Sequence, residues 1–350
     1  MVTIKNLISF SFLGFLLFGF AQTKQVISKD SIRKAGFKEY YPIHVKPSLS
    51  YLSSMYEGED ILFDAKPTAY YSIHNDMRFK MENFIYKPSY ALYLTFQPHI
   101  RMYNENSKPV KTPSYKLLLG GQVLIKTRND DFLAIALETG HYSNGQSGCA
   151  FGEGLEDESA ECIAVHQTIT NQSDLSELLN RTNGNFSTNL TNLMLSYRMN
   201  WFDEENTPFK ALELSGYWTW YHNNLIGLID IGGYTPFDIA IYGRHRFGLG
   251  AEFMHNFLNK FRYTASLKTE YISGSHPFVE PWRIEANYTI YPFNGNLGVF
   301  ISYITGHDNY NFRFVDSGNQ FSLGITWDWF APFEIKRSEI LKDNLKSKQL

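Results

Sequence analysis

Apolar and polar residues alternate with a period of two along segment after segment of this chain. Successive side chains of a strand point to opposite faces, so this alternation predicts strands with one apolar and one polar face. One such segment sets Phe321, Leu323, Ile325 and Trp327 against Gln320, Ser322, Gly324 and Thr326. The chain is therefore expected to be all-β. About twelve strands are predicted, beginning near Ala69, Arg78, Tyr90, Tyr115, Phe132, Ser187, Lys210, Asp238, Arg262, Trp282, Leu297 and Gln320.

The connections between these strands alternate in length. Short links are expected at 87–89, 128–131 and 294–296, and long ones at 104–114, 144–186, 223–237 and 307–319. Alternation of residues alone does not separate a soluble barrel or sandwich, with its apolar face inward, from a membrane barrel. Short periplasmic turns and long extracellular loops are typical of antiparallel transmembrane β-barrels. The loop pattern therefore favours a barrel whose apolar face meets lipid.

Composition agrees with this interpretation and removes two classes of protein. The chain has 23 Tyr, 28 Phe and 6 Trp, and membrane barrels carry aromatic girdles at both interfaces. Its mean hydropathy of -0.29 and the lack of a long apolar run after the N-terminus exclude a helical membrane protein. The formal net charge of -3 argues against a nucleic-acid partner.

The N-terminal residues indicate export. Lys5 precedes an apolar run over 7–20 and a small-residue site before Gln22, the pattern of a secretory signal peptide. We therefore expect a signal peptide at 1–21, an N-terminal periplasmic extension at 22–68, the barrel at 69–330 and a C-terminal periplasmic tail at 331–350. The expected location is the bacterial outer membrane.

Two cysteines lie close together in this exported chain. Cys149 and Cys162 are expected to form a local disulfide. Between them lie the acidic residues Glu153, Glu156, Asp157, Glu158 and Glu161. Acidic oxygens at this density could bind calcium, but a solvated acidic loop is the favoured interpretation, because the spacing does not match an EF-hand.

The strand predicted over 132–143 carries the candidate chemistry. It reaches the extracellular rim, and its alternation puts His141 and Ser143 in the lipid-facing row, where polar groups are costly. Their Cβ atoms would lie about 7 Å apart on one face, which suits a nucleophile and its base. Gly145 could bring its N–H close to a substrate oxyanion. The alternative is a polar strand end entering an Asn-Gly turn.

The run His141-Tyr142-Ser143-Asn144-Gly145 resembles the His-x-Ser-Asn-Gly signature of the outer-membrane phospholipase A family. Segments 109–115 and 303–330 also look like parts of that family, and the resemblance extends over about 78–330. It implies a twelve-stranded barrel with a serine hydrolase site on its outer wall. The expected reaction is hydrolysis of acyl esters of membrane phospholipids, of the phospholipase A1 or A2 type.

The resemblance also implies a third catalytic residue, an asparagine early in the next strand, which orients the histidine. Asn189 is the best match because it shares a face with Leu193 and Leu195. Asn185 and Asn192 are rivals, the first just before the strand and the second on its other face.

Calcium and a homodimer are implied in the same way. By motif position the calcium ligands would be Gln146 and, from the second copy, Ser107. The family usually has a basic residue where this chain has Gln146, and residues 147–186 replace a short loop. Two other functions stay open: a passive porin, and a catalytically silent barrel that serves as an adhesin or structural protein.

Overall fold

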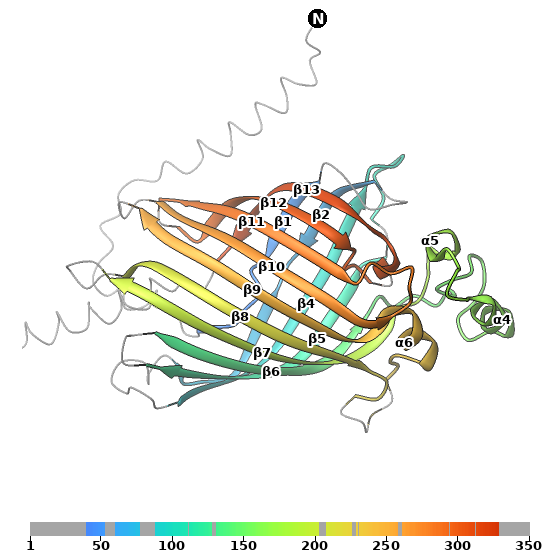
Figure 1. The fold of residues 1–350 in the computed structure, drawn as a ribbon, viewed down its shortest axis with the longest axis horizontal. Helices are drawn as coiled ribbons and strands as arrows, with labels where there is room; N and C mark the ends of the chain where they lie inside the picture. The colour runs from blue at the N-terminus through green and yellow to red at the C-terminus, as the bar shows by residue number, and fades with distance from the viewer. Residues whose placement is uncertain are drawn as a thin grey trace, which may run out of the picture. The chain divides into compact units, whose positions relative to one another are not determined.

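The computed structural model describes residues 40–52, 60–77, 88–110, 112–127, 131–202, 208–225, 229, 231–257, 261–293, 295–311 and 313–328. Its strands form one antiparallel sheet that curls into a barrel (Figure 1). The strands are β1 (Ser48–Leu52), β2 (Ile61–Lys66), β3 (Ala69–Asn75), β4 (Pro88–Tyr103), β5 (Ser114–Lys126), β6 (Phe132–Ser143), β7 (Ser187–Phe202), β8 (Pro208–His222), β9 (Gly243–Phe257), β10 (Phe261–Ser275), β11 (Trp282–Pro292), β12 (Leu297–His307) and β13 (Ser317–Trp327).

The ring closes through the first strands. β1 pairs with β13 on one side and with β2 on the other. β4 then pairs with β3 along one part of its length and with β2 along another. β2 and β3 thus occupy one position, interrupted at Pro67, which has no backbone N–H to donate. Counting them together, the thirteen described strands make a closed barrel of twelve, as the alternation predicted.

The expected start of the barrel at Ala69 is wrong. β1 and β2 both lie within 22–68, the segment expected as a periplasmic extension, so the barrel begins at Ser48. The strand expected near Arg78 lies outside the described residues. Pro88 and Ser89, expected in a tight link, begin β4. Two strands were predicted before the one near Tyr90, and the ring also has two positions before β4, namely β1 and the combined β2 and β3. β6 is therefore the fifth strand around the ring, as predicted.

The strand expected from Asp238 is also wrong, because this residue lies in helix α6 (Pro236–Tyr242) and β9 begins only at Gly243. Thr235 caps the helix: its hydroxyl accepts a hydrogen bond from Asp238 N, and the Asp238 carboxylate accepts one from Thr235 N. Pro236 stands at the first turn, where its missing N–H is not needed. These local bonds favour a helix over the strand that the alternating apolar residues suggested.

The two faces of the barrel wall differ in polarity as the sequence predicts. On β6, Leu137 is 55% exposed on the outside, and the next residue, Glu138, is 7% exposed on the inside. The same contrast repeats on the other strands, with apolar side chains outward and polar ones buried inward. An apolar exterior around a polar lumen identifies a transmembrane β-barrel of the outer-membrane type. None of the described helices is both long and apolar enough to cross a membrane.

Residues 40–47 lie inside the barrel. The Ile43 N–H donates to Gln122 Oε1, and the Gln122 amide donates back to Ile43 O, so this segment is bonded to β5. Lys46 Nζ donates to Glu252 Oε1 on β9 at 2.8 Å. A cavity of 540 Å³ lined largely by polar and charged side chains occupies the lumen beside this segment.

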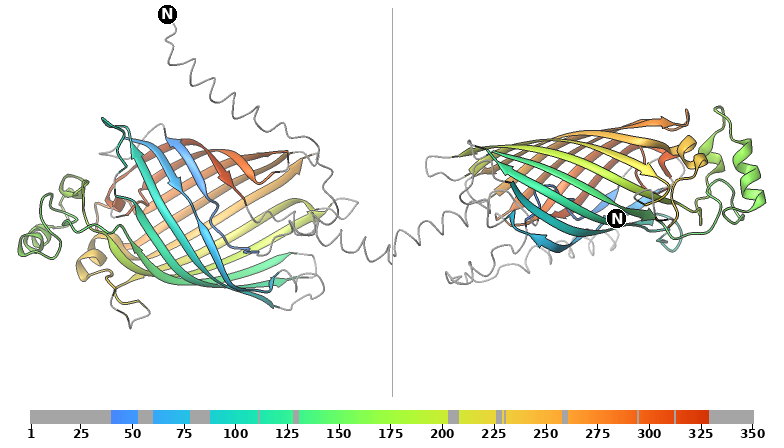
Figure 2. Two further views of the ribbon diagram at one scale, coloured as in Figure 1. Left: turned by 180° about the vertical axis from the view of Figure 1, so that it is seen from behind. Right: turned by 90° about the horizontal axis from the view of Figure 1, so that it is seen from below.

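Long loops cover one end of the barrel (Figures 1 and 2). They carry α4 (Ala160–Thr168), α5 (Leu175–Leu178), α6 and the short 3-10 helix η1 (Arg313–Val315). Their apolar side chains pack with those at the strand ends in one buried cluster that includes Phe151, Phe186, Tyr242 and Phe314. Arg181 joins the β6–β7 loop to Asp316 at 2.6 Å. This end is extracellular by the rule that long loops face outward.

Candidate active site on the outer wall

Strands β6 and β7 present three of the residues singled out in the sequence on the outside of the barrel. His141 and Ser143 lie near the extracellular end of β6, in the same outward row as Leu137. The antiparallel register sets Asn189 of β7 directly opposite His141. Side chains opposite one another in adjacent strands are close enough to interact.

His141 and Asn189 are in contact. His141 Nδ1 lies 3.1 Å from Asn189 Oδ1. The Asn189 amide nitrogen donates to two main-chain carbonyls, Asn223 O and, at 2.7 Å, Gly232 O. Both amide hydrogens are thus engaged, so the oxygen faces the imidazole and accepts from Nδ1–H. In the tautomer that makes this hydrogen bond, Nε2 is the nitrogen that can accept a proton.

Ser143 lies two residues beyond His141 on the same face. In the register it stands opposite Tyr115 of β5 and Ser187 of β7. The hydrogen bonds between described residues include none from Ser143 to His141. Side chains two residues apart in a strand are separated by about 7 Å at Cβ.

The turn after Ser143 is held by Asn144, a residue to which the sequence assigned no role. Its buried side chain accepts hydrogen bonds from Gln146 N and Phe186 N, and it donates to Gly184 O. Gly145 is exposed with φ +64, a conformation that glycine adopts without strain. Its N–H donates to none of the other described residues. The Asn-Gly turn, considered as an alternative to a site, is therefore present and follows the candidate nucleophile.

The two rival asparagines lie elsewhere. Asn185 donates to Asp157 Oδ2 at 2.5 Å, within the β6–β7 loop. Asn192 lines the lumen and accepts from Thr219 Oγ1. Neither has a described hydrogen bond to His141, so Asn189 is the asparagine that the fold brings to the histidine.

The candidate calcium ligands do not form a site within one chain. Ser107 is an exposed loop residue beside Lys108, and Gln146 is neutral and on a different loop. Calcium takes six to eight oxygen ligands, usually with carboxylates among them. The described part of the chain holds no cluster of three acidic or histidine ligands; the one group of ligand-type atoms is Cys149, Cys162 and His166. Ser107 and Gln146 therefore do not fit a calcium ion by themselves.

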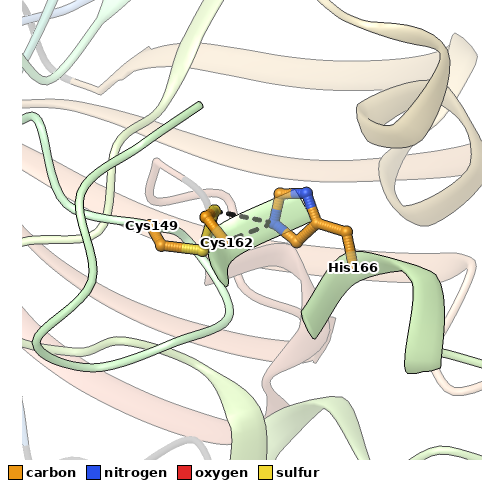
Figure 3. A group of neighbouring side chains, drawn as sticks. All are labelled: Cys149, Cys162 and His166. Carbon is orange, nitrogen blue, oxygen red and sulfur yellow. Dashed lines mark hydrogen bonds between the residues drawn. A yellow bond between two sulfur atoms is a disulfide. The ribbon is translucent and has the colours of Figure 1, made fainter. Parts of the chain in front are cut away.

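The cysteines of that group form the expected disulfide. Figure 3 shows His166 pointing at it, with Nε2 3.6 Å from Cys149 Sγ and 3.5 Å from Cys162 Sγ. The imidazole also stacks on Phe237 of α6, with ring centroids 3.7 Å apart, and burial lowers its pKa. Sulfurs joined to each other are not thiolate ligands, so this cluster fastens the loop and does not form a metal site in the oxidised protein.

Comparison with known proteins does not establish the function of this chain. No protein-family model and no curated protein matches the sequence. Among solved structures, outer membrane phospholipase A from Escherichia coli is 11% identical with a TM-score of 0.47, covering 85% of this chain and 96% of that one. The outer membrane phospholipase dimer with bound calcium from Salmonella typhi is 11% identical with a TM-score of 0.46, covering 88% and 99%. The NanC porin is 10% identical with a TM-score of 0.38, covering 81% and 100%.

Proposed function

We propose that this barrel is a phospholipase A that hydrolyses acyl esters of membrane phospholipids, with Ser143 as nucleophile, His141 as base and Asn189 as the residue that orients the base. The observation that carries the proposal is the contact between His141 Nδ1 and Asn189 Oδ1 at 3.1 Å on the lipid-facing wall. A histidine bonded to an amide on that wall is costly in contact with lipid, so polar groups are seldom placed there without a function.

The chemistry follows from the tautomer. His141 Nε2 takes the proton of the Ser143 hydroxyl as Oγ attacks the ester carbonyl, and the proton then passes to the leaving lysolipid oxygen. Water, deprotonated by the same nitrogen, releases the fatty acid and restores Ser143. Asn189 keeps Nδ1–H in place and stabilises the imidazolium that forms. The N–H of the exposed Gly145, two residues after Ser143, is the donor assigned to the oxyanion, because Asn144 N–H is bonded to Phe186 O.

The wall beside the site suits acyl chains. On β5, Leu117 stands opposite His141 in the register, and Tyr115 stands opposite Ser143. Both are exposed on the outside, and Tyr115 stacks on Phe96 of β4. Acyl chains can therefore stay in the bilayer against an apolar surface while the ester group, at the interface, meets Ser143.

Calcium dependence and dimerisation are parts of this proposal that follow from the family resemblance. Because one chain does not assemble a calcium site, oxygen ligands would have to come from a second copy as well. No step of the chemistry above is assigned to the ion. Chelation and crosslinking test both points separately from the nucleophile.

The decisive experiment replaces Ser143 by alanine and measures fatty-acid release from phospholipid vesicles. We expect release to fall to background in Ser143→Ala because the nucleophile is gone. Ser187→Ala is the matched control: it removes the serine directly opposite in the register, and release should persist. A fluorophosphonate probe should label the wild-type protein but not Ser143→Ala. Undiminished release from Ser143→Ala would refute the proposal. Parallel reactions with calcium and with chelator measure the metal requirement.

A further inference from the structure

The loop between β8 and α6 is described at 223–225, 229 and 231–234, and these residues, called here the 223–234 loop, cover part of the outer wall. Asn189 belongs to the outward row of β7, yet it is 0% exposed. The hydrogen bonds from its amide to Asn223 O and Gly232 O place the backbone of this loop over it. In Figure 1 the described parts of the loop lie at the same end of the barrel as α6. The loop is therefore in contact with the side of the barrel that faces lipid.

The backbone of this loop is closely packed and hydrogen-bonded to itself. Leu225 and Ile229 exchange two backbone hydrogen bonds, of 2.9 and 3.1 Å, like a small hairpin. A Cβ on Gly233 would lie 2.0 Å from Asn223 O, and Gly232 has φ +81, so glycine is required at both positions. The two carbonyls that orient Asn189 thus come from segments of the loop that pack directly on each other.

Two large apolar side chains of this loop are about half exposed. Ile229 is 52% exposed and Ile231 is 45% exposed. Ile231 immediately precedes Gly232, whose carbonyl bonds Asn189 on the outer wall. Ile231 thus belongs to a stretch of backbone that lies on the outer wall near its extracellular rim. Exposed apolar residues at that level favour the boundary between lipid headgroups and acyl chains.

We propose that the 223–234 loop is a lipid-interface anchor that positions Asn189: Ile229 and Ile231 insert into the outer leaflet, and this contact holds the Asn223 and Gly232 carbonyls on the Asn189 amide. Membrane contact would then support the orientation of His141. The positioning part rests on the proposed function, whereas the insertion of the isoleucines does not.

The first experiment measures insertion without any reaction. Cysteine is introduced in turn at 229, 231 and 163, labelled with an environment-sensitive dye, and the protein is placed in phosphatidylethanolamine and phosphatidylglycerol vesicles containing doxyl-labelled phosphatidylcholine. Ile163, on α4, is the matched control because it is an isoleucine of similar exposure, 48%, in the β6–β7 loop. We expect quenching at 229 and 231 and little at 163. Equal quenching at all three positions, or none at 229 and 231, would overturn the anchor.

The second experiment measures positioning. In vesicles, Ile229→Ser with Ile231→Ser should slow labelling of Ser143 by a fluorophosphonate about tenfold or more, because small displacements of catalytic groups have effects of this size. Ile229→Leu with Ile231→Leu should restore the rate, which separates lipid contact from misfolding. Ile163→Ser should label at the wild-type rate. Unchanged labelling in the double serine variant would refute the positioning role.

The two proposals fail in different ways. If wild-type protein is never labelled at Ser143, the proposed hydrolase is wrong, while the quenching pattern still decides whether the loop enters lipid. If wild type is labelled and the double serine variant is equally fast, the hydrolase stands and the coupling is wrong.

Discussion

At the scale of single residues, the hydrogen-bond acceptors around Asn189 explain why this position suits an amide and not a carboxylate. A carboxylate offers only acceptors, whereas the amide gives two hydrogens to the carbonyls of Asn223 and Gly232 and one oxygen to His141. The buried position makes each of these bonds matter, because an unsatisfied buried group is costly. The loop backbone therefore selects asparagine.

This selection predicts that Asn189→Asp is harmful although the shape is conserved. An anionic oxygen would face two carbonyl oxygens, and we expect a loss of about 1–3 kcal/mol in the free energy of unfolding. Fatty-acid release should fall as well, because the loop and the imidazole would move. Urea titration monitored by Trp fluorescence measures stability. Asn192→Asp, in the lumen, is the control for a simple charge effect; equal stability and activity in Asn189→Asp and wild type would contradict the donor arrangement.

At the scale of elements, the β6–β7 loop is attached both to α6 and to the end of β6 next to the candidate site. The β6–β7 loop carries the disulfide between Cys149 and Cys162, and His166 packs between it and Phe237 of α6. Its end returns to the turn after Ser143 through the hydrogen bond from Asn144 N to Phe186 O. The loop thus connects the extracellular cluster to the strand end that bears the candidate nucleophile.

Removal of the disulfide should loosen this loop and leave the barrel intact. The bridge spans a sequence separation of 13, for which loss of the crosslink lowers local stability by about 3 kcal/mol. We therefore expect protease cleavage within 147–186 to be faster in the double variant Cys149→Ser, Cys162→Ser. Mass spectrometry of the fragments locates the cuts, and the heat-dependent gel shift of folded barrels is the control. Cleavage at the wild-type rate would show that packing alone holds the loop.

At the scale of the whole molecule, the lumen is filled from both ends. Residues 40–47 cross it on one side, with Lys46 bonded to Glu252 and Ile43 to Gln122. The apolar cluster around Phe186 and Phe314 covers the other side. What the described residues leave between them is a cavity of 540 Å³. A lumen occupied in this way argues against the alternative function of a passive porin, which needs an open water-filled path.

The filled lumen predicts the electrical behaviour of the reconstituted protein. In planar bilayers we expect no steady conductance of the size given by an open channel, because ions would need to pass the segment and the apolar cluster. A known porin inserted under the same conditions is the positive control. Insertion of this chain is checked by protease protection of its barrel. A stable open state in the wild-type protein would favour the channel over the lipid-facing hydrolase.

Much of the wall and part of the site follow from local sequence. The outward row that holds His141 and Ser143 was predictable because both lie in one strand, where parity alone decides the face. β1 also shows the alternation of a strand, since Leu49 and Tyr51 alternate with Ser48 and Ser50. A segment of five residues is too short for this period to identify a strand. α6 shows the opposite error, because in a short segment alternation and a helix are hard to distinguish.

The sequence by itself determined the class of the protein. A strand wall between lipid and a polar lumen must alternate at every step, and the alternation of short and long links separated a membrane barrel from a soluble one. Tertiary structure decided which asparagine meets His141, since that depends on the register between β6 and β7 across a 43-residue connection, 144–186. It also decided what covers Asn189. Backbone carbonyls carry no sequence signature, so the contribution of Asn223 and Gly232 becomes visible only when the 223–234 loop is folded onto the wall.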